Sequence, residues 1–533
     1  MARGSTAVVI AVAGALALAL ASPASAASKN VELVGNVPEA KNATAINFLN
    51  YGSMGRGKGA GNAQGSHDVM LVTGRFGLKS YSLANPAKPR FLDEITAEEL
   101  RLPGDPAVRY AADGTPISTF WQNEDMDVDR DRKLAIMSRD PRAYAGSTSR
   151  EPGEPDPNGA TNIAGFYVVD AKNPRDLKLL TFQQLPTGHT TTCINGCQWT
   201  WSGGPASTTR QREQLGWTFG RPIIVTDLTD PANPKAYPQN PVDLFRRDGA
   251  TAYAHDVQVD AAGVAWVSGD GGTRGYWTDG VHFDPLQNTE RLATPLDPIP
   301  YGGGGLPRSV TADDTGGFEH NAWRPVGDTA PSDPRYRRGE MLLVSEEDFN
   351  PASNQCRDRS MFTIASLEGS YDGDAWRSTP ENPYRLQVVG KWNPFEKEGS
   401  RPTSGPYNPL ADFCSAHYFD VDGPLVTMAW YGEGTRFLDI SDPANPTQVA
   451  YWRPEDGVVW ASYLHNGYVY TADRTRGVDV LKLKLPARAS ATGKRRAVSA
   501  PRMKKRQVRF LKRLARSYAP DPATGGLCLL PRY

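Results

Sequence analysis

The chain has 533 residues, and its 59 basic and 59 acidic side chains give a formal net charge of zero. A neutral chain offers no electrostatic reason to expect nucleic acid as a partner. Its 52 glycines and 43 prolines are typical of turns, and long periodic helical segments are scarce, so the composition favours many short strands.

The N-terminus is typical of a secretory signal peptide. A basic start ending at Arg3 precedes the apolar run 7–20, and residues 22–26 end in a small-x-small cleavage pattern. The apolar run is too short to span a bilayer, and no later stretch has membrane length. We therefore expect cleavage near Ala26, loss of residues 1–26, and a mature protein that is secreted or associated with the cell envelope.

A strand-turn phrase recurs along the chain. It reads LTDPANP at 228–234 and ISDPANP at 440–446, with looser copies at 77–89 and 165–174. Each copy is a β-branched or aromatic strand that ends in a turn, because Asp or Asn bonds to the turn backbone and Pro fixes φ. An apolar segment then begins the next strand.

A hairpin pattern precedes these phrases, as in 254–269, where two alternating strands flank a tight turn. Hairpins of this kind begin near Ala43, Glu124, His189, His255, His320, His417 and Val459. Two hairpin strands and two strands of the phrase make a four-stranded antiparallel propeller blade. We predict an all-β fold, a seven-bladed β-propeller over residues 27–487, with six or eight blades as the alternatives.

The last unit, 460–483, has no strand-turn phrase after it and so lacks a fourth strand. Val31–Val37 has the character of the strand that normally follows the phrase. We predict that this N-terminal strand closes the ring, because closure removes the exposed edge of a three-stranded blade.

Four of the seven histidines, His189, His255, His320 and His417, occupy the first position of the hairpin pattern, and Glu124 holds that position one blade earlier. Propeller rotation relates such positions, so we expect an arc of side chains around one mouth of the ring. Imidazoles with a carboxylate suit one transition metal ion, either copper, zinc or iron. The alternative is a structural residue inherited by duplication.

Five cysteines in an exported chain allow two internal disulfides. Cys193 and Cys197 flank a short turn, where an oxidising compartment favours a local bridge over a metal site. Cys356 and Cys414 are the natural second pair, which leaves Cys528 unpaired.

Other motifs give weaker signals. The acidic runs 125–129 and 346–349 are candidates for Ca²⁺ binding or acid–base chemistry, and we interpret them as solvated caps of blade turns. We find no nucleophile elbow, no His-Glu-x-x-His helix and no phosphate loop.

The blade pattern ends before a basic tail, residues 488–533. Apolar residues at helical spacing predict a short basic helix over 507–518. Such a helix suits contact with an anionic envelope surface. The alternatives are a helix docked on the propeller and a disordered tail.

The strand-turn phrases at 222–234 and 435–446 resemble the LVIVD repeat, a blade motif of secreted and envelope-associated propellers. The resemblance implies the fold and export but no reaction. The copper-dependent methanethiol oxidase and selenium-binding family is distantly similar, because it too is a propeller with histidines facing its centre and residues 188–193 resemble its His-rich blade starts.

Two functions follow. The first is a ligand- or partner-binding scaffold at the cell surface or outside the cell, whose partner is an unknown surface protein or small ligand. The alternative is a metal-dependent, copper-type oxidoreductase with the histidine arc as its ligands. The sequence does not decide whether the chain is an enzyme.

Overall fold

The computed structural model describes residues 26–51, 68–110, 112, 114, 116–118, 124–140, 143–144, 163–204, 223–237, 244–245, 251–252, 254–269, 272–284, 287–305, 318–327, 330–347, 361–367, 387–394 and 415–484. The predicted basic tail and Cys356, Cys414 and Cys528 lie outside these residues. The helical elements described are the short α2 (Pro334–Arg337) and the 3-10 turn η1 (Pro38–Ala40). No helix in these ranges has the length and apolar character needed to cross a bilayer.

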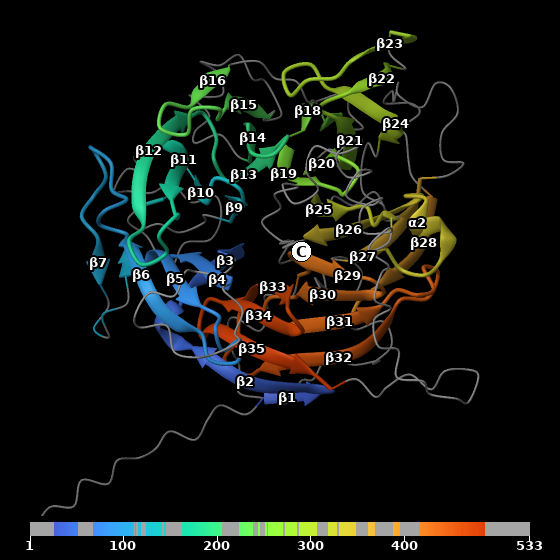
Figure 1. Cartoon of the computed structure of the whole chain (residues 1–533). Helices are drawn as coiled ribbons and strands as arrows, with labels where there is room; N and C mark the ends of the chain where they lie inside the picture. The colour runs from blue at the N-terminus through green and yellow to red at the C-terminus, as the bar shows by residue number, and fades with distance from the viewer. Residues whose placement is uncertain are drawn as a thin grey trace, which may run out of the picture.

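Antiparallel sheets stand around a central axis and form a seven-bladed β-propeller, as the repeats predict (Figure 1). Blade 1 contains β3 (Ala43–Asn50), β4 (Asp68–Gly74), β5 (Gly77–Ser82) and β6 (Arg90–Thr96). Blade 2 contains β9 (Met126–Asp129), β10 (Leu134–Arg139), β11 (Ala164–Asp170) and β12 (Lys178–Leu185). Blade 3 contains β13 (Thr190–Ile194), β14 (Trp199–Gly203), β15 (Ile224–Asp227) and β16 (Lys235–Tyr237).

The remaining blades follow the same order from the axis outward. Blade 4 contains β19 (Ala254–Val259), β20 (Val264–Gly269), β21 (Gly272–Trp277) and β24 (Ile299–Gly305). Blade 5 contains β25 (Phe318–Trp323), β26 (Met341–Glu347), β27 (Phe362–Ser366) and β28 (Gln387–Trp392). Blade 6 contains β29 (Phe419–Asp422), β30 (Leu425–Ala429), β31 (Thr435–Asp439) and β32 (Thr447–Pro454). Blade 7 contains β33 (Val459–His465), β34 (Tyr468–Asp473) and β35 (Gly477–Leu483).

The N-terminal strand closes the ring as predicted. β2 (Val31–Val37) pairs antiparallel with β35 and becomes the fourth strand of blade 7. The preceding strand, β1 (Ala26–Lys29), adds a fifth strand to blade 6 by pairing with β32. The start of the described chain therefore joins two blades and covers the edges that both would otherwise expose.

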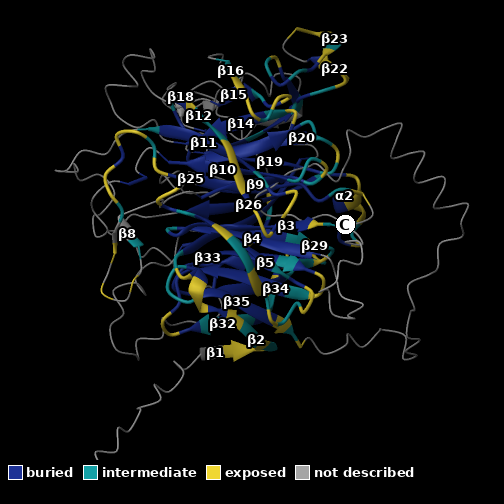
Figure 2. Ribbon diagram, turned by 60° about the vertical axis from the view of Figure 1, so that its left-hand side comes forward, coloured by how far each residue is buried: buried dark blue, intermediate teal, exposed yellow. Residues whose placement is uncertain are grey.

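The hydrophobic core fills the seams between neighbouring blades, and the exposed residues lie around it (Figure 2). Between blades 1 and 2, the buried side chains of Leu71, Ile95, Met126 and Tyr167 belong to one cluster. Because each sheet packs against a neighbour on both faces, inner strands such as β4 are buried along their whole length. Each buried aliphatic or aromatic side chain contributes about 1.5–3 kcal/mol.

Acidic side chains of one inner strand accept hydrogen bonds from the backbone of the inner strand in the next blade. Asp125 Oδ2 accepts from the backbone N–H of Thr191 at 2.9 Å, and Asp127 Oδ2 accepts from that of Cys193 at 2.7 Å. Both carboxyl groups are buried. The interpretation of this acidic run as solvated caps is therefore wrong for these two residues, because the bare edge of each innermost strand needs partners for its N–H groups.

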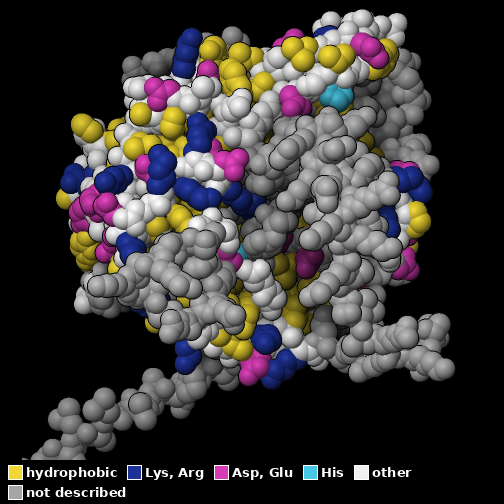
Figure 3. All heavy atoms as spheres, viewed as in Figure 1, with side chains coloured by type: hydrophobic (Ala, Val, Ile, Leu, Met, Phe, Trp, Pro, Cys, Tyr) yellow, Lys and Arg dark blue, Asp and Glu magenta, His cyan; other side chains and the backbone are white. Residues whose placement is uncertain are grey.

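Three small two-stranded sheets decorate the blades, namely β7 (Arg109–Tyr110) with β8 (Pro116–Ser118), β17 (Leu244–Phe245) with β18 (Thr251–Ala252), and β22 (Val281–Asp284) with β23 (Thr289–Leu292). The β22–β23 hairpin projects from blade 4 (Figure 1), and its Val281, Phe283 and Leu292 are exposed. Hydrophobic side chains show at this edge of the molecule (Figure 3). The predicted bridge between Cys193 and Cys197 is present and closes the β13–β14 hairpin.

Candidate metal centre

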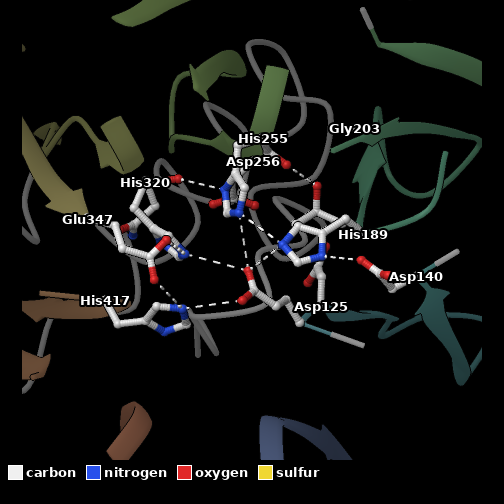
Figure 4. Close-up of polar contacts among 12 residues, drawn as sticks. Asp125, Asp140, His189, Gly203, His255, Asp256, His320, Glu347 and His417 are labelled. Atoms are coloured by element: carbon white, nitrogen blue, oxygen red, sulfur yellow. Dashed lines mark hydrogen bonds and ion pairs between the residues drawn. The ribbon is translucent and has the colours of Figure 1, made fainter. Parts of the chain in front are cut away.

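The five residues of the sequence-predicted set come together at the centre of the ring (Figure 4). Each is supplied by the start of the innermost strand of one blade, from blade 2 to blade 6. Glu124, His189 and His417 lie just before β9, β13 and β29, while His255 and His320 lie inside β19 and β25. All five side chains are buried.

Irregularities in the inner hairpins turn these side chains toward the axis. The register of β19 with β20 shifts between Ala254 and Asp256, so His255 has no partner in the ladder. The register of β25 with β26 shifts between Glu319 and Asn321, which isolates His320 in the same way. A β-bulge bends the strand and re-aims the extra residue.

One carboxylate lies among the four imidazoles. Glu124 Oε2 is 3.0 Å from His189 Nε2, 3.3 Å from His255 Nε2 and 3.5 Å from His320 Nε2. The other oxygen, Glu124 Oε1, is 3.4 Å from His417 Nε2. His189 Nε2 and His255 Nε2 are 3.0 Å apart. All four imidazoles therefore present the same ring nitrogen to one point.

The opposite ring nitrogens are held by groups outside this point. His189 Nδ1 lies 2.7 Å from Asp140 Oδ2, His255 Nδ1 lies 3.2 Å from the carbonyl oxygen of His320, and His417 Nδ1 lies 2.5 Å from that of Trp460. A carbonyl can only accept, so Nδ1 carries the proton in His255 and His417. Nε2 of these two rings then offers its lone pair to the centre, as in metal-binding histidines.

Glu347, at the end of β26, is a second carboxylate at the centre. Its oxygens lie 3.8 Å from His320 Nε2 and 3.8 Å from His417 Nε2. Tyr431 donates a hydrogen bond to Glu347 Oε1. The sequence analysis includes Glu347 in the acidic run 346–349 but not in the metal set, because it ends the second strand of its blade and does not begin the first.

The spacing of these atoms fits a metal ion. Adjacent donors of an ion with bonds of about 2.1 Å are about 3.0–3.4 Å apart. The separations of the Glu124 oxygens from the four Nε2 atoms, 3.0, 3.3, 3.5 and 3.4 Å, are close to this spacing. Three groups of donor atoms lie within 4.8 Å of one another: Glu124, His320 and His417; Glu124, His189 and His255; and His255, His320 and Glu347. The buried Nε2 of His417 makes no hydrogen bond to any described residue, which a metal bond would remedy.

Electrostatics divide the imidazoles into two kinds. Burial lowers the pKa of His189, but the charges of Glu124 and Asp140 outweigh it and raise this pKa to about 10. Burial also opposes the ionisation of Glu124, yet His189 and the other imidazoles hold its pKa well below the usual range. The pKa values of His255 and His320 are lowered, first by burial. Without metal, the centre therefore holds a protonated His189 against an ionised Glu124.

Two glycines make room for His189. A Cβ at Gly188 would overlap the backbone of Gly165, and one at Gly204 would overlap the Cβ of His189. Gly204 also has a φ of +103°, which disfavours any other residue. The start of blade 3 can therefore approach blade 2 closely enough for His189 to reach Asp140.

Two further histidines within the described ranges lie away from the centre. His465, at the end of β33, pairs with Asp68, and His282 stacks on Trp277 in the blade 4 insertion. His67 lies outside the described residues.

Three comparisons with known proteins were informative only as distant likenesses among solved structures. No family model matches the chain, and no curated protein matches it. Among solved structures, the WD40 repeats of RRP9 are 8% identical with a TM-score of 0.41, covering 86% of this chain and 97% of that one. The β-propeller domain of Cps50 (Swd1) from Myceliophteria thermophila is 8% identical with a TM-score of 0.43, covering 85% of this chain and 99% of that one.

Proposed function

We propose that this protein is an exported metalloprotein whose propeller holds one transition metal ion through Glu124, His189, His255, His320 and His417, and that it acts as a metal-dependent oxidoreductase. The observation that carries the proposal is the convergence of four imidazole Nε2 atoms within 3.5 Å of one carboxylate. A purely structural repeat residue would not require this convergence. Imidazole-rich donor sets suit copper, iron and zinc.

The surroundings of the centre favour redox chemistry. The rings of Tyr418, Tyr431 and Trp460 lie 4.7, 4.8 and 4.8 Å from that of His417, measured between centroids. Electron-rich aromatic side chains next to a ligand suit a metal that changes oxidation state. Copper or iron bound here would supply that oxidation state change, while the protein orients the ligands and restricts water.

The test is the metal content of the purified mature protein, measured after exposure to copper, iron and zinc in turn. We expect about one equivalent of copper or iron in the wild type. A variant with all four ring histidines changed to Ala should keep the fold by circular dichroism and lose the metal. His282→Ala removes a histidine outside the centre and should retain it.

Absence of bound metal from the folded wild type after all three exposures would contradict the metal proposal. One equivalent of zinc, with neither copper nor iron retained, would keep the metal site but contradict the oxidoreductase assignment, because zinc has no redox chemistry. An electron paramagnetic resonance spectrum with nitrogen hyperfine structure would identify imidazole-bound copper directly.

Export and membership of the LVIVD propellers are part of the same proposal. The basic start, apolar run and small-x-small pattern of residues 1–26 support export, and the strand-turn phrases support the LVIVD assignment. N-terminal sequencing of protein from the culture medium tests the first. A mature N-terminus near Ala27 is expected, whereas retention of residues 1–26 in the cell would contradict it.

A binding scaffold is the second candidate function. The exposed apolar side chains of Val281, Phe283 and Leu292, with 65%, 55% and 60% of their surface accessible, favour it. Apolar residues grouped at a projecting hairpin are common at interaction sites. A partner captured by the wild type but not by a Phe283→Ser variant, with no metal bound to either, would favour this function over the oxidoreductase.

A further inference from the structure

The ring position occupied by the metal set exists in all seven blades, and two blades fill it differently. In blades 7 and 1, the corresponding residues are Trp460 and Thr44. Both lie at bulges like those of His255 and His320, because the registers shift between Val459 and Ala461 and between Ala43 and Ala45. The metal ligands therefore form an open arc, and blades 7 and 1 occupy its gap.

Two arginines lie at this gap. Arg474 follows β34 in blade 7, and Arg75 follows β4 in blade 1, each in the turn after the second strand of its blade. The same turn carries Asp140 in blade 2. The carbonyl oxygen of Arg474 accepts from the backbone N–H of Asn42 at 2.9 Å, which ties the two blades together at this point.

The guanidinium of Arg474 stands beside the metal centre on an aromatic platform. Its Cζ lies 4.9 Å from the centroid of the Trp460 ring, and that ring lies 4.8 Å from the imidazole of His417. Thus one aromatic ring separates the cation from a metal ligand. Cation–π contact fixes the plane of the guanidinium without using its N–H donors.

Arg474 is half-buried, and unlike three fully buried arginines it forms no ion pair with a carboxylate of the described residues. Arg139 pairs with Asp105, Arg324 with Asp260, and Arg436 with Glu433. For Arg474 the side-chain contact is the one with Trp460. A half-buried guanidinium without a carboxylate partner can bind an anion through its N–H donors.

Neighbouring charges agree with an anion-binding role. Burial lowers the pKa of Arg474, and burial together with the charge of Arg474 lowers the pKa of Arg75 to about 10. Glu124 and Asp473 act on Arg474 in the opposite direction and raise its pKa. An anion bound beside Arg75 would offset the repulsion that Arg474 exerts on it.

We propose that Arg474, seated on Trp460 with Arg75 nearby, binds the carboxylate of a small organic acid whose remaining atoms reach the metal centre. The planar guanidinium matches a carboxylate through two parallel N–H···O bonds. The open side of the ligand arc faces this subsite, so an acid anchored here presents its other end to the metal. The assignment of this acid as substrate rests on the proposed oxidoreductase function, whereas its binding does not require metal.

The test is calorimetric titration of the metal-free full-length mature protein with acetate, benzoate and inorganic phosphate. We expect at least one of the two carboxylates to bind, and Arg474→Gln to weaken that binding at least about tenfold, because hydrogen bonds to a charged group are lost. Arg474→Lys keeps the charge and should bind with intermediate affinity. Arg476→Gln is the matched control, since it removes the same charge from the same turn but from a side chain that pairs with Asp456 and Asp479.

Equal binding by the wild type and Arg474→Gln, or the absence of carboxylate binding in the folded wild type, would overturn the inference. Binding of phosphate alone would overturn the organic acid assignment and indicate an inorganic oxyanion. Carboxylate binding at Arg474 in a protein that never retains metal would support the subsite and contradict the proposed oxidoreductase. Metal binding by a protein that binds neither carboxylate nor phosphate would support the proposed oxidoreductase and contradict the subsite.

Discussion

Blades 2–6 and blades 7 and 1 use one backbone position for two kinds of chemistry. In blades 4 and 5 the bulged residue is a histidine whose Nε2 points at Glu124, while in blades 7 and 1 it is Trp460 or Thr44. The β-bulge is common to these blades, so the blade architecture sets where the side chain at this position points. The residue type then decides whether the position supplies a proposed metal ligand or forms the platform for Arg474.

The strongest test of this comparison is His255→Ala. Loss of a ligand that lies 3.3 Å from Glu124 and 3.0 Å from His189 Nε2 should weaken metal binding by more than about a hundredfold. Competition with a chromophoric chelator measures the change. A variant that binds metal as tightly as the wild type would exclude His255 as a ligand.

Proton competition should give the next largest effect. His189 has a pKa of about 10 without metal and therefore carries a proton at neutral pH, which the metal must displace. Affinity should rise with pH by about tenfold per unit between about pH 7 and 9, and weaken as the pH falls. Calorimetry in buffers of different ionisation enthalpy counts the released proton. A pH-independent affinity over this window would exclude His189 as a ligand.

Asp140→Asn should have a smaller effect because Asp140 acts through His189. The carboxylate 2.7 Å from Nδ1 orients the imidazole and increases its basicity, and loss of such a partner costs about ten- to a hundredfold in metal affinity. The variant should also move the pH dependence to lower pH, since one of the charges that raise the pKa of His189 is gone. An unshifted pH profile would contradict the positioning role of Asp140.

Thr44→Ala should have the smallest effect. Its hydroxyl donates to the carbonyl of Thr73, so its loss should reduce the free energy of unfolding by about 1 kcal/mol. Metal affinity should stay within about twofold, because Thr44 occupies the gap and not the arc. Thermal unfolding and the chelator competition measure the two quantities. A large loss of metal would place blade 1 among the ligand-bearing blades.

Much of the candidate site could be predicted from the sequence because repetition aligns it. Glu124 and the four histidines share one position of the hairpin pattern, and rotation carries equivalent positions onto one arc. Glu347 and Asp140 could not be found in this way. Glu347 ends the second strand of its blade and Asp140 follows that of its own, where the repeat has no common residue. They reach histidines of neighbouring blades, namely His417 and His189.

The sequence by itself determined the strands, the turns between them, the number of blades and the closure by β2, because alternation and turn chemistry are local properties of the chain. Tertiary structure alone decided that the imidazoles converge. Convergence depends on bulges at His255 and His320 and on close packing at Gly204. It also depends on partners of Nδ1 that are distant in sequence, as the carbonyl oxygen of Trp460 is for His417. These are properties of blades packed around an axis, which no single blade contains.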